Sequence, residues 1–337
     1  MTPHCSPAHF CAFFVLLRTF AHTSSHFKIP APAGIFFRTG SFAELAKGTK
    51  GFEVKNAFLK FTTTGIVTLE GKGLFSTGDT YTTTDVDGGT YYVAINPTNA
   101  KIAFKASSYG AEIKSTEFDF DEKKIYDLKT LTTYNLYIED NSGYMKMYVH
   151  GWNIANQDVI LGTGWPGVEA KTLDKAITKD NKKYTKVIAL SDKVVATGKY
   201  GFVLNNGGMG SQYGDYTPTT LANNLYYTAN PKNLIYIKAS GVASGEWKSN
   251  LYCYIWKENG NNKWSWPGEK VNTNDSYDIY GNGEKYYLFD AGESKNYNRL
   301  IINKNGNPQT GNITIPNVGK GNGVEVKTKD QVYIWGI

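Results

Sequence analysis

The sequence predicts an all-β protein of three consecutive β-sandwich domains that follow a disordered N-terminal segment. The chain has 24 Tyr and 35 Gly among 337 residues, which is typical of strands joined by many turns. Short runs of alternating apolar and polar residues recur between turn residues, while helical spacing is scarce. The best helical candidate, TKDNKKYTKVIAL, is short and weakly patterned. The length predicts two or three domains at about 100–200 residues each.

The charge and cysteine patterns exclude several classes of function. The formal net charge of +6 is spread thinly, and a nucleic-acid-binding surface would need a basic cluster, so we expect no nucleic-acid partner. The three cysteines, Cys5, Cys11 and Cys253, form no CxxC pair, and four of the five histidines lie before residue 27. This spacing supports neither a zinc site nor a disulfide framework, and we expect no metal and no cofactor.

The first 36 residues contain an apolar run, CAFFVLLRTFA at 11–21, which Arg18 interrupts. Its length fits the apolar part of an export signal, and it is too short to span a bilayer. We therefore expect residues 1–36 to be an export segment or a disordered leader. We expect the protein to be extracellular or on the cell surface, at the outer membrane, with membrane association only through an anchor.

Residues 37–131 are predicted to form the first sandwich. The run AFLKFTTTGIVTLEGKGL alternates and is expected to turn at Gly71 and Gly73, and short strands are predicted at 88–97, 100–107, 113–121 and 123–132. The pattern GGTYYVAINPTNAKIAFK, followed by FDFDEKKIYDLKTL, resembles the fimbrillin-like surface proteins of Bacteroidota over about 75 residues. The resemblance implies a β-sandwich at the cell surface and no particular chemistry.

Residues 132–231 (copy 1) and 232–337 (copy 2) are predicted to be tandem copies of one domain. Each opens with an alternating strand and reaches a second strand that ends at Trp152 or Trp256. Each then continues through a polar loop to a Trp-Pro-Gly sequence. Strands at 183–191 and 285–292 follow, and the copies are expected to close with matching strands at 223–229 and 330–336. Five landmarks in the same order indicate a true repeat.

The aromatic residues of the second strand of copy 2 are predicted to share one face. Residues two apart in a strand point the same way, so Tyr252, Tyr254 and Trp256 should face outward and Cys253 and Ile255 inward. Exposed flat rings usually mark a binding surface, and they suit the C–H faces of sugars.

Six of the seven tryptophans divide into two expected groups. The same counting of alternate positions places Trp264 and Trp266 on one face of the chain. These two tryptophans and Trp165 have polar neighbours, which predicts that they are exposed. By contrast, Trp256 and Trp335 have the apolar neighbours expected of core residues, and Trp152 matches Trp256. Pro and Gly beside Trp266 would hold its loop still and lower the entropy lost on binding.

Copy 2 carries a second resemblance. The runs NLYCYIW, WSWPGEKV and LIINKNGNPQTGNITI resemble the starch-binding carbohydrate-binding modules of family 26, over about 105 residues from Asn233 to Ile337. The family implies a β-sandwich that holds α-glucans on a shallow surface. By resemblance, Tyr254 and Trp266 would be the stacking pair, with Trp264 competing for the role of Trp266, and Gln309 would contact sugar hydroxyls. Tyr252 and Lys257 are neighbouring candidates.

Copy 1 departs further from this pattern. His150 occupies the position of Tyr254, Trp165 that of Trp266, and Gln212 that of Gln309. His150 either stacks on a sugar or is a plain rim residue, and Tyr148 is a substitute for it. At the other copy, Gly311 and Asn312 stand where the family often has an acidic residue.

The sequence therefore predicts non-catalytic binding of starch or maltooligosaccharides by two linked modules at the cell surface. Other surface proteins of glycan uptake are expected as further partners. Glycoside hydrolysis normally needs two carboxylates across a cleft, and Asp275, Asp278 and Glu293 lie in polar stretches that do not pair them. Two alternatives stay open: a structural or adhesive subunit of a surface fibre, and the non-catalytic tail of a longer amylase.

Overall fold

The computed structural model describes residues 57–337, except 99, 123, 191–192, 209–210, 220, 222, 242–244 and 294–296. The predicted leader at 1–36 and the start of the first predicted domain, 37–56, lie outside the described residues. The described part contains strands, a single turn of 3₁₀-helix (η2, Lys248–Asn250) and no α-helix, so the all-β prediction is confirmed. None of the described residues belongs to a helix long and apolar enough to cross a membrane.

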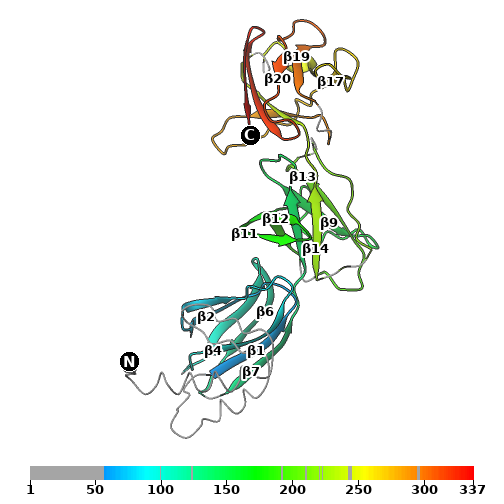
Figure 1. Ribbon diagram of the computed structural model, residues 1–337. Coiled ribbons are helices and arrows are strands. Elements are labelled where there is room, and N and C mark those ends of the chain that lie inside the picture. Colours follow the sequence, from blue (N-terminus) through cyan, green and yellow to red (C-terminus); the bar gives the residue numbers. More distant parts are fainter. Residues whose placement is uncertain are drawn as a thin grey trace, which may run out of the picture.

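The strands form six sheets that face one another in pairs, and the three pairs follow one another along the molecule (Figure 1). The first unit contains β1 (Ala57–Thr63), β2 (Thr68–Phe75), β3 (Gly78–Thr82), β4 (Gly89–Ile95), β5 (Ile102–Ser108), β6 (Ala111–Phe118) and β7 (Ile125–Leu131). Its sheets have the orders β4-β1-β7 and β3-β2-β5-β6. Between them lies a core in which Leu59, Phe61 and Phe104 are almost fully buried.

The turn that the sequence predicts at Gly71 and Gly73 is not there. Both glycines lie inside β2, where the pairing with β3 shifts register between Glu70 and Phe75. The antiparallel turn lies further along the chain, at 76–77, where β2 ends and β3 begins. Glycine in a strand often marks such an irregularity rather than the end of the strand.

Copy 1 contains β8 (Asn135–Asp140), β9 (Tyr148–Asn153), β10 (Val168–Glu169), β11 (Lys171–Lys179), β12 (Lys182–Ala189), β13 (Tyr200–Asn205) and β14 (Asn224–Ala229). Copy 2 contains β15 (Leu234–Lys238), β16 (Leu251–Trp256), β17 (Glu269–Lys270), β18 (Tyr286–Asp290), β19 (Arg299–Lys304), β20 (Ile313–Thr314), β21 (Gly321–Thr328) and β22 (Gln331–Gly336). The sheets are β10-β9-β13 and β11-β12-β8-β14 in copy 1. In copy 2 they are β17-β16-β19-β20 and β18-β15-β21-β22.

The closing strands of the two copies do not match as the sequence predicts. In copy 1, β14 pairs in parallel with the opening strand β8. In copy 2 the strand that pairs in parallel with the opening strand β15 is β21, and β22 is an additional antiparallel strand outside it. The aromatic residues of β22 suggested that it is the equivalent of β14. The equivalent strand is instead decided by its hydrogen-bonding partner, which the residue types alone do not identify.

Copies 1 and 2 share one apolar cluster. It includes Leu136, Val149 and Phe202 of copy 1 together with Tyr236 and Leu288 of copy 2. The other face of β15, with Ile235 and Ile237, packs on a second cluster inside copy 2. The strand β15 is therefore buried on both faces, and its sequence is a nearly continuous apolar run, LIYIK, as expected for such a strand.

The first unit also packs on copy 1. Tyr109 lies edge-to-face on Tyr137 of β8, with the ring centroids 6.1 Å apart, and their hydroxyls are 3.2 Å apart. The side-chain amide of Asn224 donates to the backbone oxygens of Thr64 at 3.2 Å and Val86 at 2.7 Å. Each junction thus combines apolar burial with satisfied hydrogen bonds.

Candidate functional site

The strand β16 has the alternation that the sequence predicts. Cys253 and Ile255 are fully buried, while Tyr252, Tyr254 and Trp256 are half-buried on the opposite face. The prediction of three outward aromatic residues is confirmed, and the expectation that Trp256 belongs to the core is wrong. Its ring lies 5.4 Å from that of Tyr254 with an interplanar angle of 34°.

The Trp-Pro-Gly turn brings Trp266 to the same face. The Trp266 ring is 46% exposed and lies 5.3 Å from the Tyr254 ring at an interplanar angle of 71°. Trp256, Tyr254 and Trp266 therefore form a continuous row of three rings, which we call the copy 2 platform. Because Trp266 is steeply inclined to Tyr254, the platform is angled rather than flat.

The backbone of this turn is held in place by buried groups. The Trp266–Pro267 peptide bond is cis, and Gly268 has a φ of +99°. A Cβ on Gly268 would lie 2.1 Å from the carbonyl oxygen of Cys253, so only glycine fits between the turn and β16. The side-chain amide of the fully buried Asn303 donates to the Pro267 oxygen at 3.0 Å.

Copy 1 repeats this construction. The Trp165–Pro166 bond is cis, and Gly167, with a φ of +92°, would place a Cβ 2.0 Å from the oxygen of Val149. The amide of buried Asn205 donates to the Pro166 oxygen at 3.0 Å. The two turns therefore have the same supports in the same places.

The ring row of copy 1 contains a histidine in its centre. His150 lies 5.7 Å from Trp152 at 23° and 5.8 Å from Trp165 at 52°, and Trp165 is 38% exposed. We call Trp152, His150 and Trp165 the copy 1 platform. Trp152 is half-buried and part of this row, so its expected place in the core is also wrong. The register confirms that His150 and Tyr254 are equivalent, because Val203 of β13 pairs with His150 as Ile301 of β19 pairs with Tyr254.

Trp264 does not join the copy 2 platform. It is half-buried against the core of copy 2, and its ring lies 5.4 Å from that of Phe289 on the opposite sheet. The ammonium of Lys263 lies 4.6 Å from the centroid of the Trp264 ring. The expectation of an exposed Trp264 is wrong because residues 263–267 form bends and a turn, where positions two apart no longer share a face.

The two predicted glutamines lie beside the residues that support the turns. Gln309 and Gln212 are exposed and pair across the backbone with Asn303 and Asn205, the two residues that support the turns. Tyr252 continues the outward face of β16, beside Tyr254.

Lys257 follows β16, and its side-chain stem lies against Gly260 in the next turn. Trp335, the other tryptophan expected in the core, is half-buried against the cluster shared by the copies, and its indole N–H donates to the hydroxyl of Tyr280 at 2.9 Å.

Sequence reasoning missed Asn303 and Asn205. Besides binding the proline oxygens, each accepts a backbone N–H from a following glycine: Gly306 at 2.6 Å and Gly207 at 2.8 Å. The signal was present, since both copies have Asn followed by glycine after the same strand, in the runs INKNG and LNNGG. The described residues contain no group of three or more His, Cys, Asp or Glu side chains that could hold a metal ion.

Comparison with known proteins gives little beyond this geometry. No family model and no curated protein matches the chain. Among solved structures, it is similar to a carbohydrate-binding module of family 26 from Eubacterium rectale in complex with maltoheptaose. The sequence identity is 18% and the TM-score 0.24, and the match covers 61% of this chain and 97% of that chain. A TM-score of 0.24 does not establish a shared fold, so the function of this chain has to be inferred from its own residues.

Proposed function

We propose that the chain binds starch-like α-glucans, without catalysis, on the two ring platforms. The observation that carries the proposal is the row formed by Trp256, Tyr254 and Trp266. Trp266 is exposed, the other two rings are half-buried on the outward face of β16, and the row rests on a backbone fixed by Gly268 and Asn303. Aromatic faces are electron-rich and attract the C–H groups of a sugar ring. Rings that are already held in place lose little entropy on binding.

The angle within each platform favours a curved polymer. A flat polysaccharide would stack on coplanar rings, but Trp266 is inclined by 71° to Tyr254, and Trp165 by 52° to His150. Successive residues of a helical α-glucan present their faces at an angle to one another, as these rings do. The motif resemblance of copy 2 to starch-binding modules of family 26 points to the same ligand class.

On this proposal the protein acts at the cell surface, and binding requires no metal or cofactor. Two platforms on one chain raise the effective concentration of the second site once the first has bound the same polymer. Binding to branched, polymeric starch should therefore be tighter than binding to a short oligosaccharide.

The test is affinity electrophoresis in gels that contain amylopectin, combined with calorimetric titration of maltoheptaose. We expect the wild-type protein to be retarded, and Trp266→Ala and Trp165→Ala each to lose most of the affinity of one site. Tyr333→Ala is the matched control, because Tyr333 is 52% exposed on β22 and belongs to neither platform. Unchanged mobility of the wild-type protein would reject the proposal and favour a structural subunit of a surface fibre.

A further inference from the structure

A cleft of about 240 Å³ lies between copy 1 and copy 2. Its walls come from both copies. Copy 1 contributes Lys146, Tyr148 and Asn206, and copy 2 contributes Ser276, Tyr277 and Asp278. Sites for whole small-molecule ligands usually measure about 300–1,000 Å³, so this cleft has room for a short portion of a longer ligand.

Tyr148 joins the cleft to the copy 1 platform. It lies on the outward face of β9, one outward position before His150, at a spacing of about 7 Å along the strand. The loop after β13 lies against its ring, since a Cβ on Gly207 would come within 2.8 Å of the ring. The row of aromatic residues in copy 1 therefore does not end at His150 but continues into the cleft.

The polar groups around the cleft suit hydroxyl groups. The carboxylate of Asp278 accepts backbone N–H groups from Asn282 at 3.1 Å and Gly283 at 2.8 Å, which fixes its orientation and lowers its pKa. The hydroxyl of Tyr148 donates to Glu169 at 3.3 Å, and the Lys146 ammonium lies 3.9 Å from the same carboxylate. A ring beside a few polar groups held in fixed positions is the usual composition of a ligand site. The carboxylates of Asp278 and Glu169 would repel an anion, so a neutral ligand with hydroxyl groups suits the cleft better.

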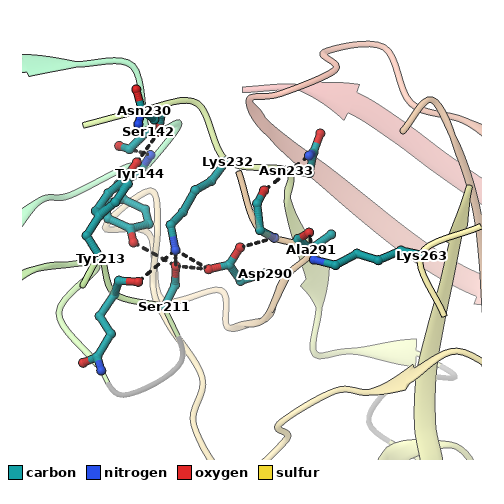
Figure 2. A network of polar contacts seen from close by, with 12 residues as sticks. Ser142, Tyr144, Ser211, Tyr213, Asn230, Lys232, Asn233, Lys263, Asp290 and Ala291 are labelled. Atoms are coloured by element: carbon teal, nitrogen blue, oxygen red, sulfur yellow. Dashed lines mark hydrogen bonds and ion pairs between the residues drawn. The ribbon is translucent and has the colours of Figure 1, made fainter. Parts of the chain in front are cut away.

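The two walls are held together by a buried polar network (Figure 2). The ammonium of Lys232 lies 2.7 Å from the Asp290 carboxylate. It also donates to the backbone oxygen of Gln212 at 2.9 Å. Ser211 of copy 1 donates to the same carboxylate of copy 2 at 2.6 Å, and its oxygen lies 2.8 Å from the hydroxyl of Tyr144. The cleft is therefore a fixed feature of the tandem and not a gap between independent domains.

We propose that this cleft extends the copy 1 platform and holds the next sugar residues of an α-glucan already stacked on His150 and Trp165. The inference rests on the proposed function, because it takes the platform to be the primary site. It adds a subsite that neither copy forms alone, and it makes copy 1 selective for longer oligosaccharides than copy 2.

The test blocks the cleft without touching the platform, in a Trp266→Ala background that leaves copy 1 as the remaining site. Ser276 is exposed at the cleft, and Ser276→Arg fills it, whereas Asn274→Arg adds the same side chain at an exposed position outside it. Lys146→Gln replaces the ammonium of the other wall by a neutral amide, at a half-exposed side chain. Dissociation constants for maltotriose and maltoheptaose are measured by calorimetry, and thermal unfolding confirms that each variant is folded.

We expect Ser276→Arg to weaken maltoheptaose binding about fivefold or more and to leave maltotriose binding unchanged. Lys146→Gln should also weaken maltoheptaose binding relative to maltotriose binding. Asn274→Arg should bind both sugars as the Trp266→Ala variant does. Equal affinities of Ser276→Arg and Asn274→Arg for maltoheptaose would overturn the cleft proposal while leaving the glucan function intact. Absence of glucan binding in the wild-type protein would instead reject the proposed function and the cleft with it.

Discussion

At the scale of single residues, the two platforms depend on backbone positions that admit no side chain. Gly268 and Gly167 both have positive φ values. A Cβ added to either glycine would lie about 2 Å from a carbonyl oxygen of the neighbouring strand, that of Cys253 or Val149. The tryptophan two residues before each glycine is therefore placed by contact between two backbones. That placement does not depend on which residues occupy the platforms.

Replacement of Gly268 should destabilise copy 2 and weaken its binding together. We expect Gly268→Ala to cost about 2 kcal/mol or more, because the backbone conformation is unfavourable for alanine and its Cβ meets the Cys253 oxygen. Gly281→Ala is the control, since Gly281 also has a positive φ, of +70°, but has nothing within 4 Å. It should cost about 1 kcal/mol. Urea unfolding measures both, and equal losses would show that close approach at Gly268 is unimportant.

Asn303 should matter to glucan binding although its buried side chain cannot contact the ligand. In Asn303→Ala the Pro267 oxygen and the Gly306 N–H lose their partners. A buried polar group without a partner costs about 1–3 kcal/mol. We expect lower stability and weaker maltoheptaose binding at copy 2, measured by urea unfolding and calorimetry. Asn274→Ala, at an exposed position, should change neither, and wild-type affinity of Asn303→Ala would contradict a supporting role.

At the scale of elements, β16 shows how much a strand determines about its own faces. A period of two residues placed Tyr252, Tyr254 and Trp256 on the side opposite to Cys253 and Ile255, and the structure agrees. The same counting failed for Trp264 and Trp266, because the chain bends between them. Alternation holds only while the backbone is extended.

Burial in β16 should make the Cys253 thiol unreactive. Cys253 is fully buried, and desolvation raises its pKa far above the ordinary value, so very little thiolate forms near neutral pH. With Cys5→Ser and Cys11→Ser in place, we expect alkylation by iodoacetamide at pH 8 to be slow in the native protein. It should be fast in denaturant. Equal rates in both states would show that β16 is open.

At the scale of the whole molecule, copies 1 and 2 form one structural unit. Their shared cluster joins Leu136 to Tyr236 and Leu288, and the Lys232–Asp290 pair lies beside it (Figure 2). Although each copy has enough residues for a core of its own, Tyr236 on one face of β15 packs in a cluster to which copy 1 contributes most of the residues. The contacts at this junction hold the strands of the two platforms, β9 and β16, in a fixed relative position.

Breaking the junction pair should lower the stability of both copies. Lys232→Met leaves the Asp290 carboxylate without its buried cation, and removal of one partner of a buried pair costs about 3–5 kcal/mol. The double variant Lys232→Met with Asp290→Leu should recover part of the loss. Lys329→Met is the control, because its pair with Asp330 is exposed and is worth less than about 1 kcal/mol. Calorimetric unfolding measures all three variants. If Lys232→Met loses no more stability than Lys329→Met, the Lys232–Asp290 pair does not stabilise the junction.

Alkaline pH should open the same junction. Burial raises the pKa of Tyr144, Tyr213 and Tyr236 above the ordinary tyrosine value. A group with a raised pKa in the folded state stabilises the protein fully below its unfolded pKa, about 10, and this contribution is lost as the pH rises further. We expect the unfolding temperature of the tandem to fall above about pH 10. An unfolding temperature that stays constant to pH 12 would contradict burial of these hydroxyls.

The sequence by itself determined the all-β class, the repeat, the outward face of β16 and the equivalence of His150 with Tyr254. These features depend on residue spacing along one extended segment, and spacing can be read directly from a sequence.

Only the tertiary structure decided which tryptophans join the platforms, which strand closes copy 2 and how the copies meet. Trp266 joined a platform and Trp264 packed on a core because the chain bends between them, and β21 replaced β22 because hydrogen bonding to β15 selected it. Asn303, Lys232 and the cleft at Tyr148 acquire their roles from partners 20 or more residues away in the chain. Contacts across such separations depend on how the sheets pack, which local spacing does not specify.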